Sequence, residues 1–392
     1  MKILLLAPHP FYQDRGTPIA VDLLARSLSA MGHDVDLVTY HEGQDRMYEG
    51  PGRVRIVRIA APPGCRGIRP GFSLKKLLAD VYLYRRAAAL LASQRYDVVH
   101  AVEEAAFMAR RFKRRFGVPY VFDMDSSMPE QIVEKMPYLR PFLGIMRGFE
   151  SRALRDAVAV TAVCDALADV ARSAGATDIT LLRDVPLLSD SVPDGARGFR
   201  AELGLDGTVV LYLGNFEAYQ GVELLVRSFA RLPAGHDAHL VLVGGIPAQI
   251  QRLRDLATRL GCSARVHLPG PRPLRDMAAL LAEADILVSP RIKGTNTPMK
   301  IYSYMAAGKA ILATDLFTHT QVLDHETACL APPEEKAFSA ALARLIADPA
   351  GRAEMGRRAA HKVKTEYSLE VYQRSLAALY DHVRRAVEAA DR

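Results

Sequence analysis

The stretch ADILVSPRIKGTNTPMKIYSYMAAGKAILATD, residues 284–315, decides the predicted fold. Asp285–Ser289 is a short apolar run rich in branched residues, as is typical of a parallel strand covered on both faces. Thr297-Pro298 predicts a helix start, since threonine can cap a helix and proline suits its first position. Gly308 then ends the helix, and Ala310–Thr314 forms the next strand. The stretch predicts a strand–loop–helix–strand unit.

The start of this helix is a candidate anion site. Unpaired backbone N–H groups and the helix dipole favour negative charge there. Lys300, in the first turn, adds a full positive charge, and Ser303 shares its helix face. The alternative is an ordinary capped helix with a solvated lysine, and spacing alone does not separate the two interpretations.

The composition is that of a basic globular protein. A length of 392 residues predicts two or three domains at roughly 100–200 residues each. The net charge of +7 favours anionic partners such as nucleotide diphosphates, lipid headgroups or nucleic acid. No aromatic-and-basic motif supports nucleic acid, so we expect no nucleic-acid partner.

The cysteines indicate a cytoplasmic protein. Cys65, Cys164, Cys262 and Cys329 are scattered, which predicts reduced thiols and no metal-binding cluster. The N-terminal MKILLLAPHP is too short an apolar run for a signal peptide and is expected to be a strand. No run approaches the ~20 apolar residues that span a bilayer.

Strand and helix patterns alternate almost throughout, which predicts parallel sheets with helices on both faces. Ile3–Ala7 is the first expected strand. Thr17-Pro18 then repeats the threonine–proline helix start, so Gly16 and Thr17 mark a second exposed helix N-terminus. Further strands are expected at Val35–Tyr40, Val54–Ile59, Asp97–His100, Tyr120–Phe122, Ala157–Val163 and Ile179–Leu182.

The pattern restarts after a polar, turn-rich linker at Ser189–Gly198. The next strands end in glycine: Val209–Leu213 leads into Gly214-Asn215, with Gln220-Gly221 before the following helix, and Leu240–Val243 leads into Gly244. Strands at Arg265–Leu268, Asp285–Ser289 and Ala310–Thr314 complete a second sheet, and helices fill Glu334–Tyr367 and Leu369–Ala390.

The predicted fold is therefore α/β, with two doubly wound Rossmann-like domains at residues 1–190 and 199–366. Such domains bind ligands beyond the carboxyl ends of their strands, so we expect a cleft between the two. Both threonine–proline helix starts could face this cleft, which favours a ligand with a charged diphosphate.

Polar residues follow the strand at Tyr120, in the sequence Asp123-Met124-Asp125-Ser126-Ser127. Their place past a strand's carboxyl end makes them candidate ligand contacts. A helix cap is the alternative for any one of them.

Three stretches, residues 72–91, 107–115 and 137–155, are basic and amphipathic. Surface helices on an anionic membrane have this composition. Helices packed on a sheet with a solvated basic face have it too, so both interpretations stay open.

Several segments of the sequence resemble those of a known family. The second half carries LYLGNFEAYQGVELLVRSFARL (211–232), LVLVGG (240–245), SPRIKGTNTPMKIYSYMAAGKAILATD (289–315), HETACLAPP (325–333) and ADPAGRAEMG (347–356). These segments resemble the GT-B glycosyltransferases, specifically the retaining family 4, or bacterial group 1, enzymes. The first half matches more loosely, through residues 15–40.

The resemblance implies a nucleotide-diphosphate sugar donor held mainly by the second domain and an acceptor bound by the first. It implies that residues 367–392 form a helix that crosses back to the first domain. It also implies no metal and no cofactor, because basic residues and helix N-termini neutralise the leaving diphosphate.

The chain departs from the family pattern at acidic positions. The two glutamates that hold the donor's sugar and ribose in the family fall on Thr295 and Ser303. A serine could still bond a ribose hydroxyl, more weakly than a carboxylate. A first-domain histidine of the family falls on Asp125, which could accept a hydrogen bond from a sugar or act as a base toward the acceptor.

The chain also departs at basic positions. The family's arginine and lysine after the first strand of the second domain fall on Asn215 and Gln220, so two phosphate-binding charges are missing. Lys300 is the first candidate to replace them, and the alternatives are Arg291, Lys293 and Arg15.

We therefore expect a glycosyltransferase, with Asp125 and Lys300 as its catalytic residues and a glycan or lipid-linked acceptor. Peripheral contact at the inner face of the membrane is a further expectation. The alternative is a catalytically degenerate GT-B scaffold of a glycan assembly system, and an epimerase or phosphorylase would keep the fold. The expected donor-binding residues are Gly16, Thr17, Gly214, Asn215, Gln220, Gly221, Gly244, Arg291, Lys293, Thr295, Asn296, Thr297 and Ser303.

Overall fold

The computed structural model describes residues 1–14, 16–68, 73–188, 198–233 and 235–390. The chain forms two compact units. Unit 1 comprises Met1–Arg183 and Tyr372–Arg392, and unit 2 comprises Asp184–Val371. Each carries a parallel sheet with helices on both faces, which confirms the predicted pair of Rossmann-like domains. The predicted linker lies outside the described residues except for Gly198.

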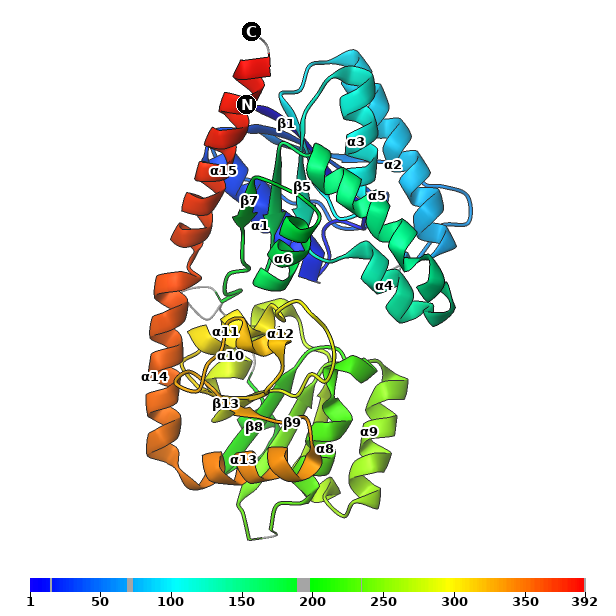
Figure 1. Cartoon of the computed structure of the whole chain (residues 1–392). Coiled ribbons are helices and arrows are strands. Elements are labelled where there is room, and N and C mark those ends of the chain that lie inside the picture. The colour runs from blue at the N-terminus through cyan, green and yellow to red at the C-terminus, as the bar shows by residue number, and fades with distance from the viewer. Residues whose placement is uncertain (15, 69–72, 189–197, 234, 391–392) are drawn as a thin grey trace. The chain divides into compact units, whose positions relative to one another are not determined.

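Unit 1 is built on a seven-stranded parallel sheet in the order β3-β2-β1-β4-β5-β6-β7 (Figure 1). Its central strands are buried on both faces, as strands between two helical layers should be. The strands are β1 Lys2–Ala7, β2 Asp34–Thr39, β3 Val54–Arg58, β4 Val98–Val102, β5 Tyr120–Met124, β6 Ala159–Ala162 and β7 Ile179–Leu181.

The helices of unit 1 follow the strands that they connect. They are α1 Gly16–Ala30, α2 Leu74–Ser93, α3 Ala105–Phe116, α4 Met128–Lys135, η1 Pro137–Phe142, α5 Leu143–Asp156, α6 Asp165–Ser173 and, from the end of the chain, α15 Leu369–Ala390.

Unit 2 repeats the architecture with a six-stranded parallel sheet in the order β10-β9-β8-β11-β12-β13. The run TVVLYL of β8 is buried after its first residue because helices pack on both sides. The strands are β8 Thr208–Leu213, β9 Ala238–Val243, β10 Val266–Gly270, β11 Ile286–Ser289, β12 Ala310–Thr314 and β13 Cys329–Ala331.

The helices of unit 2 are α7 Arg200–Leu203, η2 Ala218–Gln220, α8 Val222–Ala230, α9 Pro247–Arg259, η3 Ser263–Arg265, η4 Leu274–Asp276, α10 Met277–Ala282, α11 Lys300–Ala306, α12 Phe317–Thr320, α13 Glu335–Ala347 and α14 Pro349–Glu366. None of the described helices in either unit is long and apolar enough to cross a membrane.

The start of α11 differs from the prediction. The helix begins at Lys300, its N-cap position is Met299, and no side chain caps it. Thr297 is only 3% exposed, and the carbonyl of Pro298 accepts a hydrogen bond from the N–H of Ile301 (2.9 Å). The predicted Thr297 cap is wrong because the threonine side chain turns into the protein. The predicted end is confirmed, since Gly308 has φ +64°.

Two elements near the C-terminus also differ. The three-residue strand β13 is too short to show a pattern in the sequence. The single helix expected over 334–367 is broken at Asp348, whose carboxylate accepts a hydrogen bond from the N–H of Gly351 (2.8 Å) and so starts α14. Pro349 occupies the first turn, where it needs no donor.

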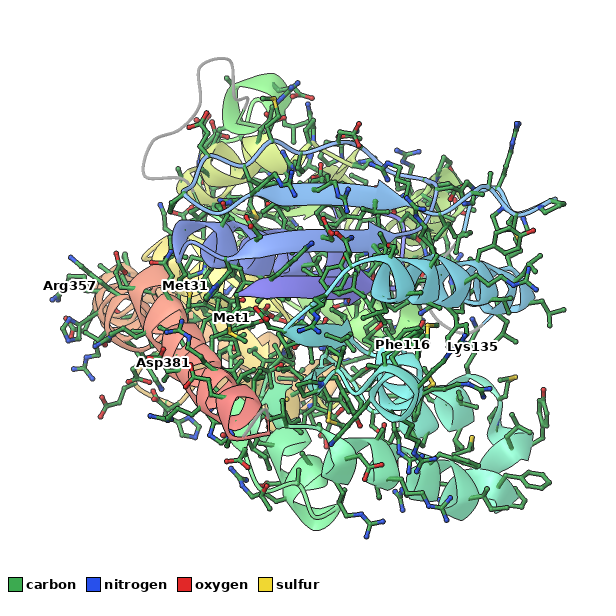
Figure 2. The ribbon with its side chains drawn as sticks, turned by 90° about the horizontal axis from the view of Figure 1, so that it is seen from above. Met1, Met31, Phe116, Lys135, Arg357 and Asp381 are labelled. Atoms are coloured by element: carbon green, nitrogen blue, oxygen red, sulfur yellow. The ribbon has the colours of Figure 1, made fainter. Side chains whose placement is uncertain are left out.

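The final helix packs on unit 1 through a buried aromatic cluster. The Tyr380 side chain is fully buried, and its hydroxyl lies 2.9 Å from Nδ1 of His100 in β4. The Tyr380 ring also lies 5.2 Å from the ring of His33. Figure 2 shows Asp381 of α15 on the side of the unit that also carries Met1. The last part of the chain is therefore held in the core of the first unit.

This packing predicts the effect of Tyr380→Phe. The change removes the hydroxyl and leaves the His100 ring nitrogen buried without its partner, so the free energy of unfolding should fall by about 1–2 kcal/mol. Denaturant titration followed by circular dichroism would measure it. Tyr138→Phe is the control, because Tyr138 is exposed and its change should have no measurable effect. Equal stability of the two variants would contradict a role of the hydroxyl in docking α15.

Candidate functional site

The order of the strands in unit 2 locates the site. Strands β8 and β11 are neighbours, but the chain leaves β8 toward β9 and leaves β11 toward β12, on opposite sides. Such a reversal opens a crevice above the carboxyl ends of the two strands, and doubly wound sheets bind ligands there. Two loops border it: residues 214–221 after β8 and residues 290–299 after β11.

Glycines bare the backbone at this edge. Gly214 has φ +140° and Gly244 has φ +129°, both costly for any other residue. A Cβ on Gly244 would lie 1.9 Å from the carbonyl oxygen of Gly214. Only glycine permits this close approach, so the predicted glycines shape the edge of the sheet.

Lys300 lies directly beneath the first of these glycines. A Cβ on Gly214 would stand 2.9 Å from Nζ of Lys300. The same nitrogen lies 3.9 Å from the centroid of the Tyr212 ring and is buried. In the described part of the chain it has no hydrogen-bond partner and no carboxylate in a salt bridge. The amine is thus held against an aromatic face without a counter-charge.

The surroundings of Lys300 disfavour its charged form. Burial, followed by repulsion from the Arg291 guanidinium, lowers the pKa of the amine from 10.5 to about 7. The aromatic face supplies only part of the stabilisation that water would give. A buried amine beside a second cation gains most from an anionic ligand. This geometry supports the anion site predicted from the sequence.

Arg291 holds the loop after β11 in shape. Its Nε donates to the carbonyl of Lys293 (2.7 Å), and its Nη1 donates to the carbonyl of Asn296 (3.0 Å). The Asn296 side-chain oxygen accepts a further bond from Nη2 (3.2 Å), and the guanidinium lies 5.2 Å from the Tyr219 ring. The side chain is thus used to close a loop rather than displayed as a free cation.

The other residues of the loop after β11 range from exposed to buried. Lys293 and Thr295 are exposed, and the carbonyl of Thr295 accepts a bond from the Gln321 amide (2.7 Å). The carbonyl of Asn296 accepts another from the Thr318 hydroxyl (2.6 Å). The Thr297 hydroxyl is buried without a partner in the described residues. It is a second polar group that a ligand could satisfy.

The loop after β8 is fastened to this one. The N–H of Ile292 donates to the carbonyl of Tyr219 (2.9 Å), and Gly221 packs so closely on Pro290 that a Cβ would lie 2.0 Å from its oxygen. Gln220 is 8% exposed, and its side-chain oxygen has no partner among the described residues. The Asn215 side chain caps its own loop by accepting a bond from the N–H of Glu217 (3.2 Å).

Ser303 of α11 is held inside unit 2. It is fully buried, and its hydroxyl accepts a hydrogen bond from the N–H of Leu187 (3.0 Å). The residue fastens the segment before the linker to α11. The serine is buried inside the unit and its hydroxyl accepts a backbone hydrogen bond, and its expected contact with the donor stays a prediction.

His319 is a site residue that the sequence did not reveal. Its Nδ1 donates to the carbonyl of Thr314 (2.9 Å), so its Nε2 accepts a bond from the Ser289 hydroxyl (2.9 Å). Burial lowers the pKa of the ring to about 4, which keeps it neutral. The histidine joins the carboxyl ends of β11 and β12. The sequence THTQ carries no pattern that distinguishes this role.

The unit 1 candidates lie at the carboxyl edge of its own sheet. Gly16 and Thr17 open α1, and Asp125 follows β5 and is half-buried. Nearby, the Ser126 hydroxyl donates to the Glu103 carboxylate (3.0 Å). The meeting of these residues with Lys300 of unit 2 stays a prediction.

A buried ion pair in unit 1 was also missed. Lys76 of α2, which lies in the basic stretch 72–91, pairs with Glu104 after β4. The Tyr40 hydroxyl donates to Asp80 beside them (2.5 Å). Burial raises the pKa of the Glu104 and Asp80 carboxyl groups, and the Lys76 ammonium opposes that rise. The cluster lies beyond β2 and β4, on the edge that borders the unit's own strand reversal.

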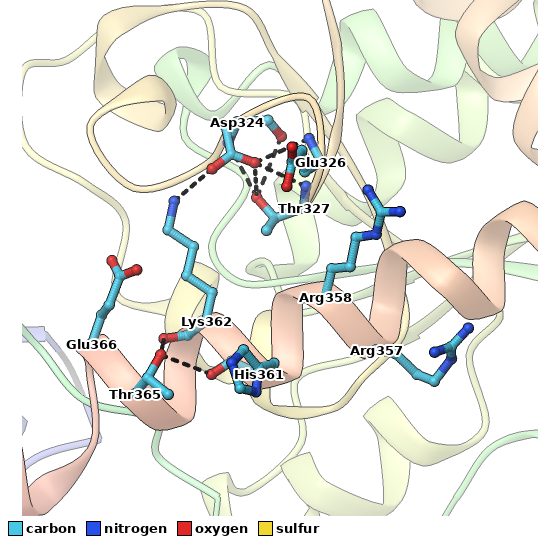
Figure 3. A pocket seen from close by; sticks show the side chains of 9 residues that line it. All are labelled: Asp324, Glu326, Thr327, Arg357, Arg358, His361, Lys362, Thr365 and Glu366. Atoms are coloured by element: carbon cyan, nitrogen blue, oxygen red, sulfur yellow. Dashed lines mark hydrogen bonds and ion pairs between the residues drawn. The ribbon is translucent and has the colours of Figure 1, made fainter.

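An open pocket elsewhere in unit 2 is a weaker candidate for binding an anionic ligand. It has a volume of about 520 Å³ and lies between α14 and the loop before β13 (Figure 3). Its cations are paired, Lys362 with Asp324 (2.7 Å) and Arg358 with Glu354 (2.7 Å). Across the described residues, no group of three or more His, Cys, Asp or Glu side chains is placed to hold a metal.

Comparison with known families adds two matches. The family described as glycosyl transferases group 1 matches residues 207–348, and a glycosyl transferase 4-like domain matches residues 15–183. The two matches cover both units, in the order that the sequence predicted. The chain belongs to the group 1, family 4 glycosyltransferases.

Relatives of this glycosyltransferase differ in how much they share. It is 25% identical to a phosphatidyl-myo-inositol mannosyltransferase of Mycolicibacterium smegmatis, over 98% of the chain and 94% of that protein. It is 28% identical to an alpha-D-kanosaminyltransferase of Streptomyces kanamyceticus, over 71% of the chain and 74% of that protein. The chain spans only 22% of a Streptomyces coelicolor exopolysaccharide phosphotransferase, with 26% identity.

Solved structures support the GT-B fold of the glycosyltransferase. A sucrose-phosphate synthase from Thermosynechococcus elongatus superposes with a TM-score of 0.79 and 22% identity, over 98% of this chain and 99% of that one. The Anabaena protein HepE, in complex with UDP-glucose, superposes with a TM-score of 0.70 and 18% identity, over 97% and 99% of the two chains.

The environment of Lys300 predicts a pH-dependent stability of the ligand-free glycosyltransferase. Because the pKa of this amine is about 7 in the folded chain and 10.5 for a solvated lysine, the unfolded chain binds more protons between these pH values. Its contribution to the free energy of unfolding should therefore rise as the pH rises from about 7 to 10.5 and stay constant below 7. Lys300→Met removes this titration, so the melting-temperature difference, wild type minus variant, should increase over that range. A difference that does not change with pH would contradict the burial of a chargeable amine.

The position of Ser303 predicts a separation of stability from binding. Ser303→Ala leaves the N–H of Leu187 without its acceptor, so the free energy of unfolding should fall by about 1–3 kcal/mol. The dissociation constant for a nucleoside diphosphate, measured by calorimetry well below the melting temperature, should not change. A large loss of nucleotide affinity without loss of stability would indicate that the serine contacts the nucleotide.

Proposed function

We propose that the chain is a retaining, metal-independent glycosyltransferase that moves a sugar from a nucleotide-diphosphate donor. The observation that carries this proposal is the buried amine of Lys300, which has neither a hydrogen-bond partner nor a carboxylate beside it among the described residues. A diphosphate would supply both a hydrogen-bond acceptor and the missing negative charge. The family assignment and the UDP-glucose complex of the HepE protein support a nucleotide sugar as the ligand.

The expected contribution of Lys300 is greatest when the donor bond breaks. Negative charge then builds on the leaving diphosphate, and a preorganised cation in a buried site stabilises it strongly. Binding of the anion also raises the pKa of the amine, since an opposite charge favours the ammonium form. The Thr297 hydroxyl and the helix start beside it are the further proposed donors to the phosphate oxygens.

The proposed acceptor side is unit 1. The acceptor hydroxyl would attack from the face that the diphosphate leaves, which gives retention, with Asp125 placed to accept its hydrogen bond or proton. The Gly16-Thr17 start of α1 would contribute backbone N–H groups to the diphosphate. We propose a glycan or lipid-linked acceptor, cytoplasmic location and peripheral contact with an anionic membrane. The mannosyltransferase relative, named for a phosphatidyl-inositol, is consistent with a lipid-linked acceptor.

A second candidate is a nucleotide-free scaffold with the same fold. It is favoured by two observations: neither Asn215 nor Gln220 supplies a phosphate-binding charge, and the Ser303 hydroxyl is used inside the unit. The two candidates differ in whether the crevice of unit 2 binds a nucleoside diphosphate. A thermal shift with UDP, GDP and ADP separates them, because only a donor site is stabilised by one of these ligands.

The proposal predicts that Lys300→Met lowers turnover on the true donor at least ~10²-fold, as loss of a buried transition-state contact does. A panel of nucleotide sugars, read out by release of the nucleoside diphosphate, would measure turnover. Lys336→Met is the control, because it removes an exposed lysine from the same unit and should leave turnover unchanged. Near-normal turnover of the Lys300 variant would reject the role of this amine, and no stabilisation by any of the three diphosphates would favour the scaffold.

A further inference from the structure

The sheet of unit 1 contains a strand reversal of its own. Strands β1 and β4 are neighbours, but the chain leaves β1 toward β2 and leaves β4 toward β5, on opposite sides. A crevice therefore opens above the carboxyl ends of β1 and β4, and doubly wound sheets bind ligands at such a place. The segments that border the crevice of unit 1 are residues 8–14 after β1 and residues 103–104 after β4.

A histidine after β1 has an unused ring nitrogen. Nδ1 of His9 donates to the carbonyl of Pro10 (3.1 Å), because a carbonyl oxygen can only accept. Burial, with repulsion from the Lys76 ammonium as a smaller cause, lowers the pKa of the ring to about 4. The ring is therefore neutral, and its Nε2 carries no proton. This Nε2 is buried without a hydrogen-bond partner in the described residues, so a hydroxyl group of a ligand could donate to it.

A second histidine, just past β2, has both ring nitrogens unused. Nδ1 and Nε2 of His41 are buried, and neither has a hydrogen-bond partner within the described ranges. The Glu42 carboxylate lies 3.9 Å from Nε2, which is too far for a hydrogen bond. The loops that carry the two histidines are joined. The Tyr40 N–H donates to the carbonyl of His9 (3.3 Å), and the Phe11 N–H donates to the carbonyl of Glu42 (3.2 Å). Buried polar groups are normally paired, so these loops suit a ligand with several hydrogen-bonding groups.

The cation at this edge is already balanced. The Lys76 ammonium pairs with the Glu104 carboxylate. Although burial opposes it, the Glu104, Glu103 and Asp80 carboxyl groups together raise the pKa of Lys76. Lys300 of unit 2 has no such partner among the described residues. The two buried lysines therefore differ: the amine of Lys300 gains from an anion, whereas the ammonium of Lys76 has no unbalanced charge to offer one.

Glu103 presents a further carboxylate at the same edge. It has φ +49°, and no other residue except glycine has a positive φ in the described part of the chain. Its N–H donates to the carbonyl of Asp123 (2.9 Å), and its half-buried carboxylate accepts a bond from the Ser126 hydroxyl (3.0 Å). The unusual backbone thus places the carboxylate beside the loop that carries Asp125. A carboxylate accepts hydrogen bonds from sugar hydroxyls and repels a phosphate.

We propose that the crevice of unit 1 binds an uncharged sugar or polyol ring of the acceptor substrate, with the His9 and His41 rings and the Glu103 carboxylate bonding its hydroxyl groups. A hydroxyl both donates and accepts, so such a ring satisfies the bare nitrogen of His9 and both nitrogens of His41. A phosphorylated ring is disfavoured, because Glu103 repels it and Lys76 is already paired. This inference rests on the proposed acceptor role of unit 1 and names the class of group that it takes.

Matched ligands test this preference without a donor. Glucose and myo-inositol are uncharged rings, and glucose 6-phosphate and myo-inositol 1-phosphate carry the same rings with a phosphate. Titrations followed by saturation-transfer NMR should show at least one uncharged ring binding ~5-fold or more tightly than its phosphate. The full-length Lys300→Met variant is titrated beside the wild type, so that phosphate bound at the amine of unit 2 is recognised. Equal or tighter binding of the phosphates to this variant, or no binding of either uncharged ring, overturns the proposal.

Histidine variants locate the binding. His9→Phe and His41→Phe should each weaken binding of the uncharged ring about 2- to 10-fold, because each removes hydrogen bonds to neutral groups. His9→Gln supplies an amide oxygen and should recover part of the loss. His325→Phe is the control, since His325 is an exposed histidine of unit 2 and its change should have no effect. Unchanged affinity in both folded variants, checked by circular dichroism, overturns the site. If they do not fold, the matched-ligand preference of the wild type decides.

A charge variant separates recognition from structural support. Glu103→Gln keeps the size of the side chain and removes its charge, so affinity for the phosphorylated rings should rise about 5-fold while that for the uncharged rings changes less than about 2-fold. A purely structural role would lower both affinities. Glu49→Gln is the control, because Glu49 is exposed and its neighbour Gly50 packs on Ser29 at the far end of α1. No gain for the phosphates in Glu103→Gln overturns the role of the carboxylate.

The outcomes distinguish this proposal from the proposed function. Ring binding is measured without a donor, so its failure overturns the acceptor site, while binding of UDP, GDP or ADP and donor turnover test the transferase by themselves. A chain that binds none of the three diphosphates but prefers uncharged rings would keep this site and reject the transferase.

Discussion

A buried primary amine without an opposite charge is the constraint on which the site depends. The Lys300 nitrogen is placed between the Tyr212 ring and the backbone of Gly214, and any side chain at 214 would collide with it. Arg291 stands close enough to lower the pKa of the amine, yet its own N–H groups are occupied by the loop. The site therefore carries an unbalanced positive group, and the proposed diphosphate would supply the missing negative charge.

The regular part of the fold follows from local signals in the sequence. Runs such as LLLA in β1 and ILVS in β11 are short, apolar and bounded by turn residues, so their burial on both faces could be expected. The glycines at 214, 244 and 308 mark places where the backbone must take a positive φ, and each does. The three-residue β13 lies below the length at which a pattern can be recognised.

The parts that escaped prediction depend on partners distant in the sequence. The Ser303 hydroxyl accepts a hydrogen bond from the N–H of Leu187, far away along the chain, which no local pattern indicates. Lys76 lies in the basic stretch 72–91, but the packing of α2 beside β1 and β2 brings it against Glu104. His319 bridges two strand ends that only the sheet makes adjacent. Periodicity predicts which face of an element is buried but does not predict which polar groups meet there.

The loop clamped by Arg291 has a thermodynamic consequence. Since residues 293–296 are already tied together by three hydrogen bonds from one guanidinium, little backbone freedom is left for an incoming molecule to remove. Association should then be governed by diffusion and by release of water rather than by a slow folding step of the loop. A rigid loop of this kind adapts less to different ligands, but it binds a fitting ligand without a slow rearrangement. This suits an enzyme that must bind a new donor in every catalytic cycle.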